Sequence, residues 1–405
     1  MRGFFHKSEL LAMGGKPDSN VARCSVCQLE KQCESPRMEA GGLGGLNVLI
    51  VGEAPGSTED QQGTQFVGKT GKHLQEVLHS IGIDMEDDTI TTNAIVCQPP
   101  NNRTPNADEL QHCRPFLSNT IKDTQPNVII PLGDTALKQV LAPYWDLNFG
   151  LFSRWAGFQI PLQPLNAWVC PTWHPSFIVR EKNEMLDLWF KKHLEAAFCL
   201  KEKPWNPVPD YKAMVEQVDD CSTVLKEMET YEGASSFDYE TNMIKPDWED
   251  AVVVSASITW GKGKAERCVA FALDDNNMAC FPKYLRSPIP KVGANIKFEQ
   301  RWSMRFFNTR VRNWVWDTMI CSHVLDHREK ITSQDFQAFI NLGLPPYSSH
   351  IKPLLKAKKG LTVNQILTEI SLPQLLTYNG LDTISEYEVA IRQMKKLKMP
   401  PPWRK

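Results

Sequence analysis

The sequence has no apolar run long enough to cross a lipid bilayer, which takes about 20 residues in a helix. The N-terminal stretch MRGFFHKSELLAMGG also lacks the continuous apolar core of a secretory signal peptide. Internal repeats and low-complexity tracts, which would indicate a solenoid or a disordered chain, are missing as well. We therefore expect a globular protein with no membrane partner and a cytoplasmic location.

Net charge is nearly absent too, because 45 Lys and Arg residues against 47 Asp and Glu residues leave a charge of -2 at pH 7. A globally basic field is thus excluded, and any DNA-binding surface has to be a local patch. The hydrophobic share of 42% and the charged share of 23% are those of ordinary globular proteins. At 405 residues the chain exceeds what one core usually organises, so we expect two domains.

The 11 cysteines are odd in number and unevenly spaced, which argues against a disulfide framework and favours metal or cluster binding. Four of them form two pairs, Cys24 with Cys27 and Cys97 with Cys113. Such a set suits a [4Fe–4S] cluster or a structural zinc, and spacing alone leaves both open beside unligated thiols. Cys33 is a fifth thiol nearby that could replace one of the four. The remaining cysteines lie in apolar contexts typical of small core residues: Cys170, Cys199, Cys221, Cys268, Cys280 and Cys321.

Short apolar stretches alternate with amphipathic ones in the first half, which is typical of an α/β domain with a mainly parallel sheet. The expected strands are residues 46–51, 89–96, 128–131 and 168–171. The expected helices are residues 70–81, 107–121, 134–141 and 183–200.

A linker is expected at residues 201–212, where three prolines and mixed charge disfavour both helix and strand. It would separate a first domain, residues 1–200, from a second domain, residues 213–395, with a tail at 396–405. Three consecutive strands are expected in the second domain: 235–241, 252–260 and 267–273. Helices are expected to dominate from Phe298 onward.

Several motifs follow one another in the first domain. They are GEAPG at 52–56, GTQFVGKTG at 63–71, TNAIVC at 92–97, NRTP at 102–105 and HPS at 174–176. In this order, across about residues 20–200, they resemble the family 4 uracil-DNA glycosylases. The resemblance implies a three-layer fold around a parallel sheet. It also implies a [4Fe–4S] cluster rather than zinc, bound by Cys24, Cys27, Cys97 and Cys113.

Base excision gives these residue types distinct tasks. A uracil flipped out of the stack can stack on Phe66, and the amide of Asn93 can read its Watson–Crick edge. The carboxylate of Glu53 can position or activate the attacking water, and His174 can stabilise the departing uracil anion. A glycine lets the backbone approach DNA closely, and an arginine can hold a phosphate. Two such residues complete the predicted substrate-binding set: Gly52 and Arg180.

Two acidic residues in the second domain, Asp238 and Glu240, lie two positions apart on an expected strand, so their side chains share one face. A carboxylate pair of this kind favours a divalent metal. Far downstream, Tyr378 and Asp382 lie one helical turn apart and also share a face. The pattern therefore predicts a metal site built from distant parts of the chain.

Together with the motif GANIKFE at 293–299, these residues resemble the 3′→5′ proofreading exonuclease domain of DNA polymerase I-type enzymes. The resemblance implies an RNase H-like mixed sheet and phosphodiester hydrolysis with two Mg²⁺ or Mn²⁺ ions. Asp238 is then expected to bridge both ions, and Glu240 and Asp382 to complete one of the sites. Tyr378 is expected to orient the attacking water.

The third predicted metal station departs from the family pattern. The family usually has an aspartate where this sequence has Glu299, whose longer side chain predicts a shifted ion or weaker activity. Asp317 matches a family position that is usually not a ligand, so it is not expected to substitute for Glu299.

The two resemblances together predict a DNA repair and proofreading protein. The combination is similar to the front part of certain phage family A DNA polymerases, in which both domains precede the polymerase. No polymerase motif follows Ala390, so a separate DNA polymerase is the expected partner. The expected substrates are uracil-containing DNA and single-stranded or frayed 3′ ends, in the host cytoplasm if a phage encodes the protein.

Two other hypotheses stay open at this point. The chain could be a non-catalytic accessory subunit that binds DNA and docks a polymerase. It could also be an active exonuclease with a degenerate glycosylase half. Most of the residue types needed for both activities are present, so the sequence separates these hypotheses poorly.

Overall fold

The computed structural model describes residues 22–202, 209–261, 263, 266–359 and 363–399. The described residues form two compact units, one up to residue 202 and the other from residue 209 onward. Half of the predicted linker, residues 203–208, and the end of the predicted tail, residues 400–405, lie outside the described residues. Across the described part of the chain, no helix combines the length and the apolar character needed to cross a membrane.

The first unit contains a five-stranded sheet in the order β2-β1-β3-β5-β4. The parallel strands are β1 (Val48–Gly52), β2 (Thr89–Asn93), β3 (Val128–Pro131) and β5 (Ala167–Val169). The antiparallel edge strand β4 (Ile160–Leu162) was not expected from the sequence. Every residue of β1 is buried, as apolar strands covered on both faces require.

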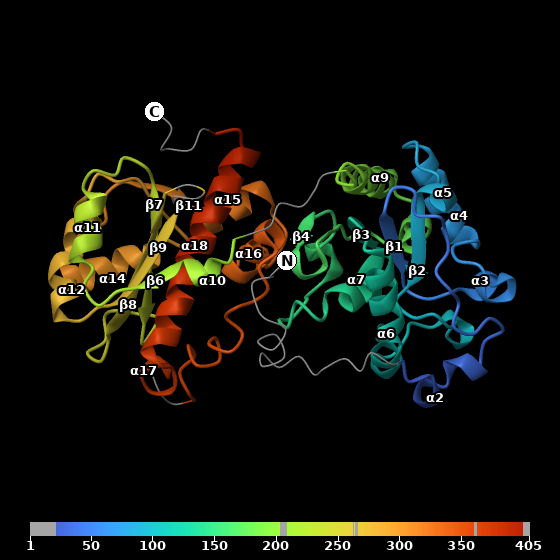
Figure 1. The fold of residues 1–405 in the computed structure, drawn as a ribbon, viewed down its shortest axis with the longest axis horizontal. Coiled ribbons are helices and arrows are strands. Elements are labelled where there is room, and N and C mark those ends of the chain that lie inside the picture. The colour runs from blue at the N-terminus through green and yellow to red at the C-terminus, as the bar shows by residue number, and fades with distance from the viewer. Residues whose placement is uncertain (1–21, 203–208, 262, 264–265, 360–362, 400–405) are drawn as a thin grey trace. The chain divides into compact units, whose positions relative to one another are not determined.

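Helices cover both faces of this sheet, which gives the expected three layers (Figure 1). On one face, Val48 and Ile50 pack against α4 (Lys69–His79) and α9 (Glu184–Phe198). On the other, α7 (Gly133–Leu141) contacts β1 and β3, and α6 (Ala107–Thr124) packs beside α7. The smaller helices of the unit are α2 (Cys24–Cys27), α3 (Ser57–Gln62), α5 (Met85–Asp88) and α8 (Pro175–Glu181).

The second unit contains a six-stranded mixed sheet in the order β11-β10-β7-β8-β9-β6. Its centre is the antiparallel meander β7 (Ser235–Thr241), β8 (Val253–Trp260) and β9 (Arg267–Ala272). On the far side of β7, β10 (Lys291–Gly293) and β11 (Trp314–Asp317) run parallel to it. At the other edge, β6 (Val215–Gln217) is parallel to β9. This is the RNase H-like arrangement that the sequence predicted.

The two faces of β7 serve different purposes. Phe237 and Tyr239 point into an aromatic core. This core lies under α11 (Ser222–Met228), α12 (Asp275–Cys280), α13 (Pro282–Arg286) and α14 (Lys297–Phe307). On the opposite face, the Ser236 hydroxyl donates to the backbone of the long helix α18 (Leu372–Lys396), which crosses the sheet (Figure 1). The alternation puts Asp238 and Glu240 on the α18 side.

The remaining helices of the second unit are α10 (Tyr211–Met214), α15 (Thr318–Leu325), α16 (Gln334–Leu342) and α17 (Ile366–Glu369). Helices dominate after Phe298, as expected, but two segments there are not helical. Strand β11 interrupts the helices, and the described residues between 343 and 365 form turns without a helix. Strand β2 also ends at Asn93 rather than at residue 96, because its partner β1 ends at Gly52.

The cysteines expected in the core need one correction. Cys199 is exposed, because it lies at the C-terminal cap of α9 and faces solvent there. The others are buried or half-buried, and the Sγ atoms of Cys221 and Cys280 lie 3.0 Å apart.

Candidate active sites

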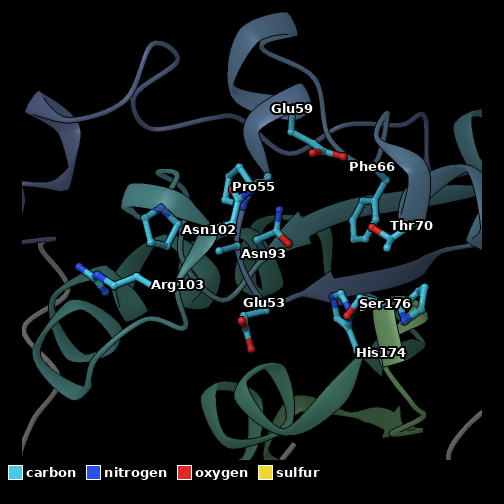
Figure 2. Close-up of a pocket in the computed structure, with 14 residues that line it drawn as sticks. Glu53, Pro55, Glu59, Phe66, Thr70, Asn93, Asn102, Arg103, His174 and Ser176 are labelled. Carbon is cyan, nitrogen blue, oxygen red and sulfur yellow. Dashed lines mark hydrogen bonds between the residues drawn. The ribbon is translucent and has the colours of Figure 1, made fainter. Parts of the chain in front are cut away.

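A pocket of about 310 Å³ lies at the carboxyl ends of β1 and β2, where parallel α/β sheets usually bind ligands. The paired strands end opposite each other at Gly52 and Asn93. Figure 2 shows the side chains of Glu53, Phe66, Asn93 and His174 around this pocket. Four residues predicted from separate segments of the sequence therefore line one cavity.

The amide of Asn93 has a defined orientation. Its Nδ2 donates a hydrogen bond to Gln65 Oε1, and Gln65 Nε2 donates to the backbone oxygen of Glu39 at 3.0 Å. Because that backbone oxygen can only accept, Gln65 must present its own oxygen to Asn93. This arrangement leaves Asn93 Oδ1 to accept a hydrogen bond from a donor on a ligand.

Gly52 provides the room in which Asn93 and Phe66 lie. A Cβ atom at this position would come within 2.2 Å of Asn93 Oδ1 and 2.9 Å of Phe66 Cζ. Both distances are too short for real contacts, so any other residue would displace the two side chains.

Phe66 has a φ of 54°, in the left-handed region that aromatic residues rarely adopt. The Gly68 N–H donates to Glu59 Oε1 at 2.7 Å, which anchors the turn that follows. Gln75 Nε2 donates to the Phe66 backbone oxygen at 3.2 Å. Gly71 lets α4 approach, since a Cβ there would lie 2.0 Å from the same oxygen. Strain of this kind is retained where it positions a functional side chain.

The carboxylate of Glu53 is held by α7. The Thr135 hydroxyl, in the first turn of that helix, donates to Glu53 Oε2 at 2.6 Å. The bond fixes the direction from which Glu53 faces the pocket.

His174 caps the N-terminus of α8. Its Nδ1 accepts a hydrogen bond from the Ser176 N–H at 3.1 Å, so in a neutral ring the proton is on Nε2. Burial, with a smaller effect of the Arg180 charge, lowers the pKa of His174 to about 4. The ring is therefore neutral at pH 7, with one N–H to donate.

Arg180 is not brought to the pocket. It lies in the last turn of α8 with its side chain 69% exposed, and it is outside the described residues that line the cavity. The cavity lining also includes polar residues to which the sequence analysis gave no role: Glu59, Thr70, Asn102, Arg103 and Ser176. Most of these lie within the motifs named above, so the sequence could have indicated them as pocket residues.

Four thiols line a second, smaller cavity in the first unit, together with apolar side chains. They come from α2, from the residues after β2 and from α6: Cys24, Cys27, Cys97 and Cys113. Two sulfurs accept backbone N–H groups, from Arg37 at 3.3 Å and from Val96 at 3.4 Å. Burial raises the pKa of both Cys97 and Cys113 to about 12, which favours the protonated thiols. Their thiolate forms therefore need a positively charged partner. Cys33 packs against the same group of buried side chains, which includes Cys97 and Cys113.

In the second unit, Asp238, Glu240 and Asp382 each offer a carboxylate oxygen within 4.8 Å of the other two. The first two come from β7 and the third from α18. Burial raises the pKa of Asp238 and of Glu240 well above the usual range, and like charges add to the effect. Burial also raises the pKa of Asp382 to about 6. A divalent cation would relieve this repulsion.

Neighbouring side chains position these carboxylates. Asn379 Nδ2 donates to Asp238 Oδ2 at 2.8 Å, and the Tyr347 hydroxyl donates to Asp382 Oδ1. The buried Tyr378 ring lies 6.0 Å from the Tyr347 ring, and its hydroxyl helps to lower the pKa of Asp382. The helical spacing that the sequence predicted therefore brings Tyr378 beside the carboxylates. Tyr347 carried no recognisable signal, because it comes from an irregular segment.

Glu299 and Asp317 differ in role. Glu299 is only 3% exposed, and the negative charge of Asp238 contributes, after burial, to raising its pKa. Asp317 instead caps α15 by accepting from the Met319 and Ile320 N–H groups, and it also accepts from Asn295 and Ile296. Four backbone N–H groups thus hold the Asp317 carboxylate.

Comparisons with known proteins identify the first unit. The model of the Uracil DNA glycosylase superfamily matches residues 39–198. The type-4 uracil-DNA glycosylase of Pyrobaculum aerophilum is 35% identical over 169 residues, which cover 40% of this chain and 82% of that protein. The chain belongs to the uracil-DNA glycosylase superfamily. The resemblance stated from its motifs is confirmed.

A further sequence comparison extends beyond the glycosylase-family unit. A DNA polymerase of Bacillus phage SP01 is 21% identical over 328 residues, which cover 74% of this chain and 34% of that protein. Among solved structures, Brucella melitensis NrnC with bound Mg²⁺ matches with a TM-score of 0.33 and 14% identity. That match covers 45% of this chain and 80% of the other.

Proposed function

We propose that this chain excises uracil from DNA with its glycosylase-family unit and removes nucleotides from DNA 3′ ends with its second unit. The observation that carries the first activity is the convergence of Glu53, Phe66, Asn93 and His174 on one pocket. The carboxylate trio around Asp238 supports the second. The sequence match to a phage DNA polymerase supports DNA as the substrate of both, and replication as the process they serve.

In uracil excision, Phe66 would stack on the flipped base and Asn93 would read its edge. Asn93 Oδ1 can accept the N3–H of uracil, which cytosine lacks. Glu53, fixed by Thr135, would hold the attacking water against the sugar carbon as the glycosidic bond breaks. The bond electrons pass to the departing uracil, whose negative charge needs a donor.

His174 suits that donor role because it is neutral. Its Nε2–H can donate a hydrogen bond to the uracil oxygen on which negative charge develops. The ring can do this in its neutral form, without first being protonated. The capping bond to Ser176 holds the ring in place throughout. We propose that Gly52 makes room for the pocket. Arg180 would bind only a DNA phosphate, at the surface.

The four thiols fit a [4Fe–4S] cluster better than a single zinc ion. In a tetrahedral zinc site, sulfurs 2.3 Å from the metal lie within about 4 Å of one another. Among the described residues, the carboxylate trio has its ligand atoms within 4.8 Å of one another, but no three of these thiol sulfurs lie that close together. The sulfurs are therefore farther apart than the ligands of a single zinc ion. The backbone N–H groups aimed at Cys97 and Cys113 would tune such a cluster. Its role would be structural, joining α2, α6 and the end of β2.

The second unit fits divalent cations, because its buried carboxylates bring hard oxygen ligands together without enough positive charge. Bound Mg²⁺ or Mn²⁺ would supply Lewis-acid activation of water and charge stabilisation at the phosphate. Asp238, Glu240, Glu299 and Asp382 would hold the ions. Asn379 keeps Asp238 in place, and the Tyr378 hydroxyl would orient the attacking water.

The proposal is tested with two substrates. A uracil-containing single strand should yield an abasic product, and Glu53→Ala should abolish it. A 3′-labelled strand with Mg²⁺ should be shortened, and Asp238→Ala should abolish that. Each variant is the folding control for the other activity. If the wild-type protein forms neither product, the chain is a DNA-binding accessory subunit instead.

A further inference from the structure

The second unit carries a concentration of positive charge on a chain whose net charge is -2. Residues 297–312 contain five Lys or Arg residues against one acidic residue, Glu299, and that acid is buried. The basic side chains are all exposed: Lys297, Arg301, Arg305, Arg310 and Arg312. A local patch of this kind is the electrostatic feature expected of a surface that binds nucleic acid.

Three of these residues form a stripe on α14. Lys297, Arg301 and Arg305 follow one another at intervals of four residues, so they share one face of the helix at steps of about 6 Å. On the buried face, Ser303 Oγ lies 2.9 Å from the hydroxyl oxygen of Tyr239. Tyr239 lies between the two acidic residues of β7, so α14 packs directly against the strand that carries them.

Three arginines form a cluster just beyond the C-terminal end of α14. Arg286 Nη1 donates to the Thr309 hydroxyl at 2.9 Å, which brings the exposed Arg286 side chain beside Arg310. The Arg312 N–H donates to the backbone oxygen of Leu285 at 2.9 Å, which brings Arg312 beside Arg286. Positive charges held this close repel one another, and negatively charged groups bound among them would relieve the repulsion.

Little negative charge neutralises this basic surface, which consists of the α14 stripe and the arginine cluster. Arg301 forms an ion pair with Asp247, with an N–O distance of 2.5 Å. Across the part of the chain that the structure describes, no ion pair includes the other members: Arg286, Lys297, Arg305, Arg310 and Arg312. Guanidinium groups bind phosphate through paired N–H donors, so cations spread over this length fit a chain of phosphates.

We propose that the basic surface binds the phosphate backbone of a single DNA strand whose 3′ end lies at the carboxylate trio around Asp238. The inference rests on the proposed exonuclease function and deepens it, because it names where the rest of the strand lies. Lys297 and Glu299, a proposed metal ligand, share the first turn of α14. Arg305 is eight residues farther along, about 12 Å away, and the arginine cluster lies beyond it. A strand therefore has to be several nucleotides long to reach the cluster.

The first test measures binding without cleavage, by the fluorescence anisotropy of a labelled, uracil-free strand with EDTA present. The full-length triple variant Arg286→Ala, Arg310→Ala, Arg312→Ala should bind at least about tenfold more weakly than the wild type at low salt. The slope of log affinity against log salt should fall by about 2, since each phosphate contact with a single strand contributes about 0.7. The matched control is a triple variant that removes the same charge from exposed positions elsewhere in the second unit, and it should bind like the wild type: Lys226→Ala, Lys395→Ala, Lys398→Ala.

The second test compares the shortening of two strands of different length in Mg²⁺. The arginine variant should raise KM for a strand of about 20 nucleotides by about tenfold with little change in kcat. It should shorten a trinucleotide, which cannot reach the cluster, at the wild-type rate, and this result also shows that the second unit is folded. If the arginine variant binds and shortens the long strand like the wild type, the surface serves another partner and the inference is wrong. Equal losses on both lengths would also overturn it. If the wild type shortens neither strand, the exonuclease proposal fails, and the binding comparison without metal still decides whether the surface holds DNA.

Discussion

Single residues decide whether the glycosylase-family pocket is assembled. Gly52 contributes no side chain, yet the Asn93 amide and the Phe66 ring both occupy the space that a Cβ atom would take. Gly52→Ala should therefore reduce uracil excision by about 100-fold, the cost typical of displacing reacting groups by about 1 Å. Excision is measured on a uracil-containing single strand. Unchanged 3′ shortening in the same preparation shows that the second unit is intact, and near-normal excision would contradict this account of the pocket.

The lowered pKa of His174 predicts how the rate of uracil excision depends on pH. Its pKa is lowered to about 4, so the imidazolium forms only as the pH falls toward that value. The ratio of wild-type to His174→Ala excision rates should stay constant from about pH 5.5 to about pH 8, because the donor remains neutral throughout. The ratio should decline only below that range. A change centred near pH 6.5 would show that the ring titrates normally and acts in its charged form.

Some properties of single residues could be predicted from the sequence and others could not. Glu53, Phe66, Asn93 and His174 could be placed in one pocket because each falls in a motif with a known order. The orientation of the Asn93 amide could not, since it depends on a chain of hydrogen bonds through Gln65 to a backbone oxygen.

At the scale of elements, the second unit joins β7 to α18 through polar contacts. The Asn379 amide donates to Asp238 and accepts from the Ser255 hydroxyl of β8 at 3.2 Å. Asn379→Leu should lower the rate of 3′ shortening by about tenfold and the free energy of unfolding by about 1–3 kcal/mol, because Asp238 loses its donor. Thr377→Val is the control, because the Thr377 hydroxyl donates to the Pro373 backbone oxygen and accepts from Gln217 Nε2 rather than bonding a carboxylate. Equal effects of the two changes would argue against this role for Asn379.

Element predictions succeeded where the residue pattern is long enough to show its period. Strand β7 was expected at residues 235–241 and has those bounds, and its alternation puts both acidic residues on one face. Strands β4, β6, β10 and β11 have only three or four residues, too few for an alternation to be recognised, whereas the equally short β3 was expected as an apolar run. Tyr347 reaches Asp382 from an irregular segment, where no period exists to be read.

At the scale of the molecule, each proposed site lies within one compact unit. The two activities should therefore respond separately to metal removal. EDTA should abolish 3′ shortening, which depends on the carboxylate site, and leave uracil excision unchanged over the same minutes. Added Mg²⁺ should restore shortening. Parallel loss of both activities would contradict the separation.

The most direct test of the account uses one substrate for both activities. A 5′-labelled single strand with an internal uracil is incubated with Mg²⁺ and then treated with alkali, which breaks abasic sites. The wild-type protein should give both a break at the uracil and a ladder of shortened strands. Glu53→Ala should give the ladder alone, Asp238→Ala the break alone, and the double variant neither. Loss of both products by either single change, or survival of either product in the double variant, would contradict the claim of two separate active sites.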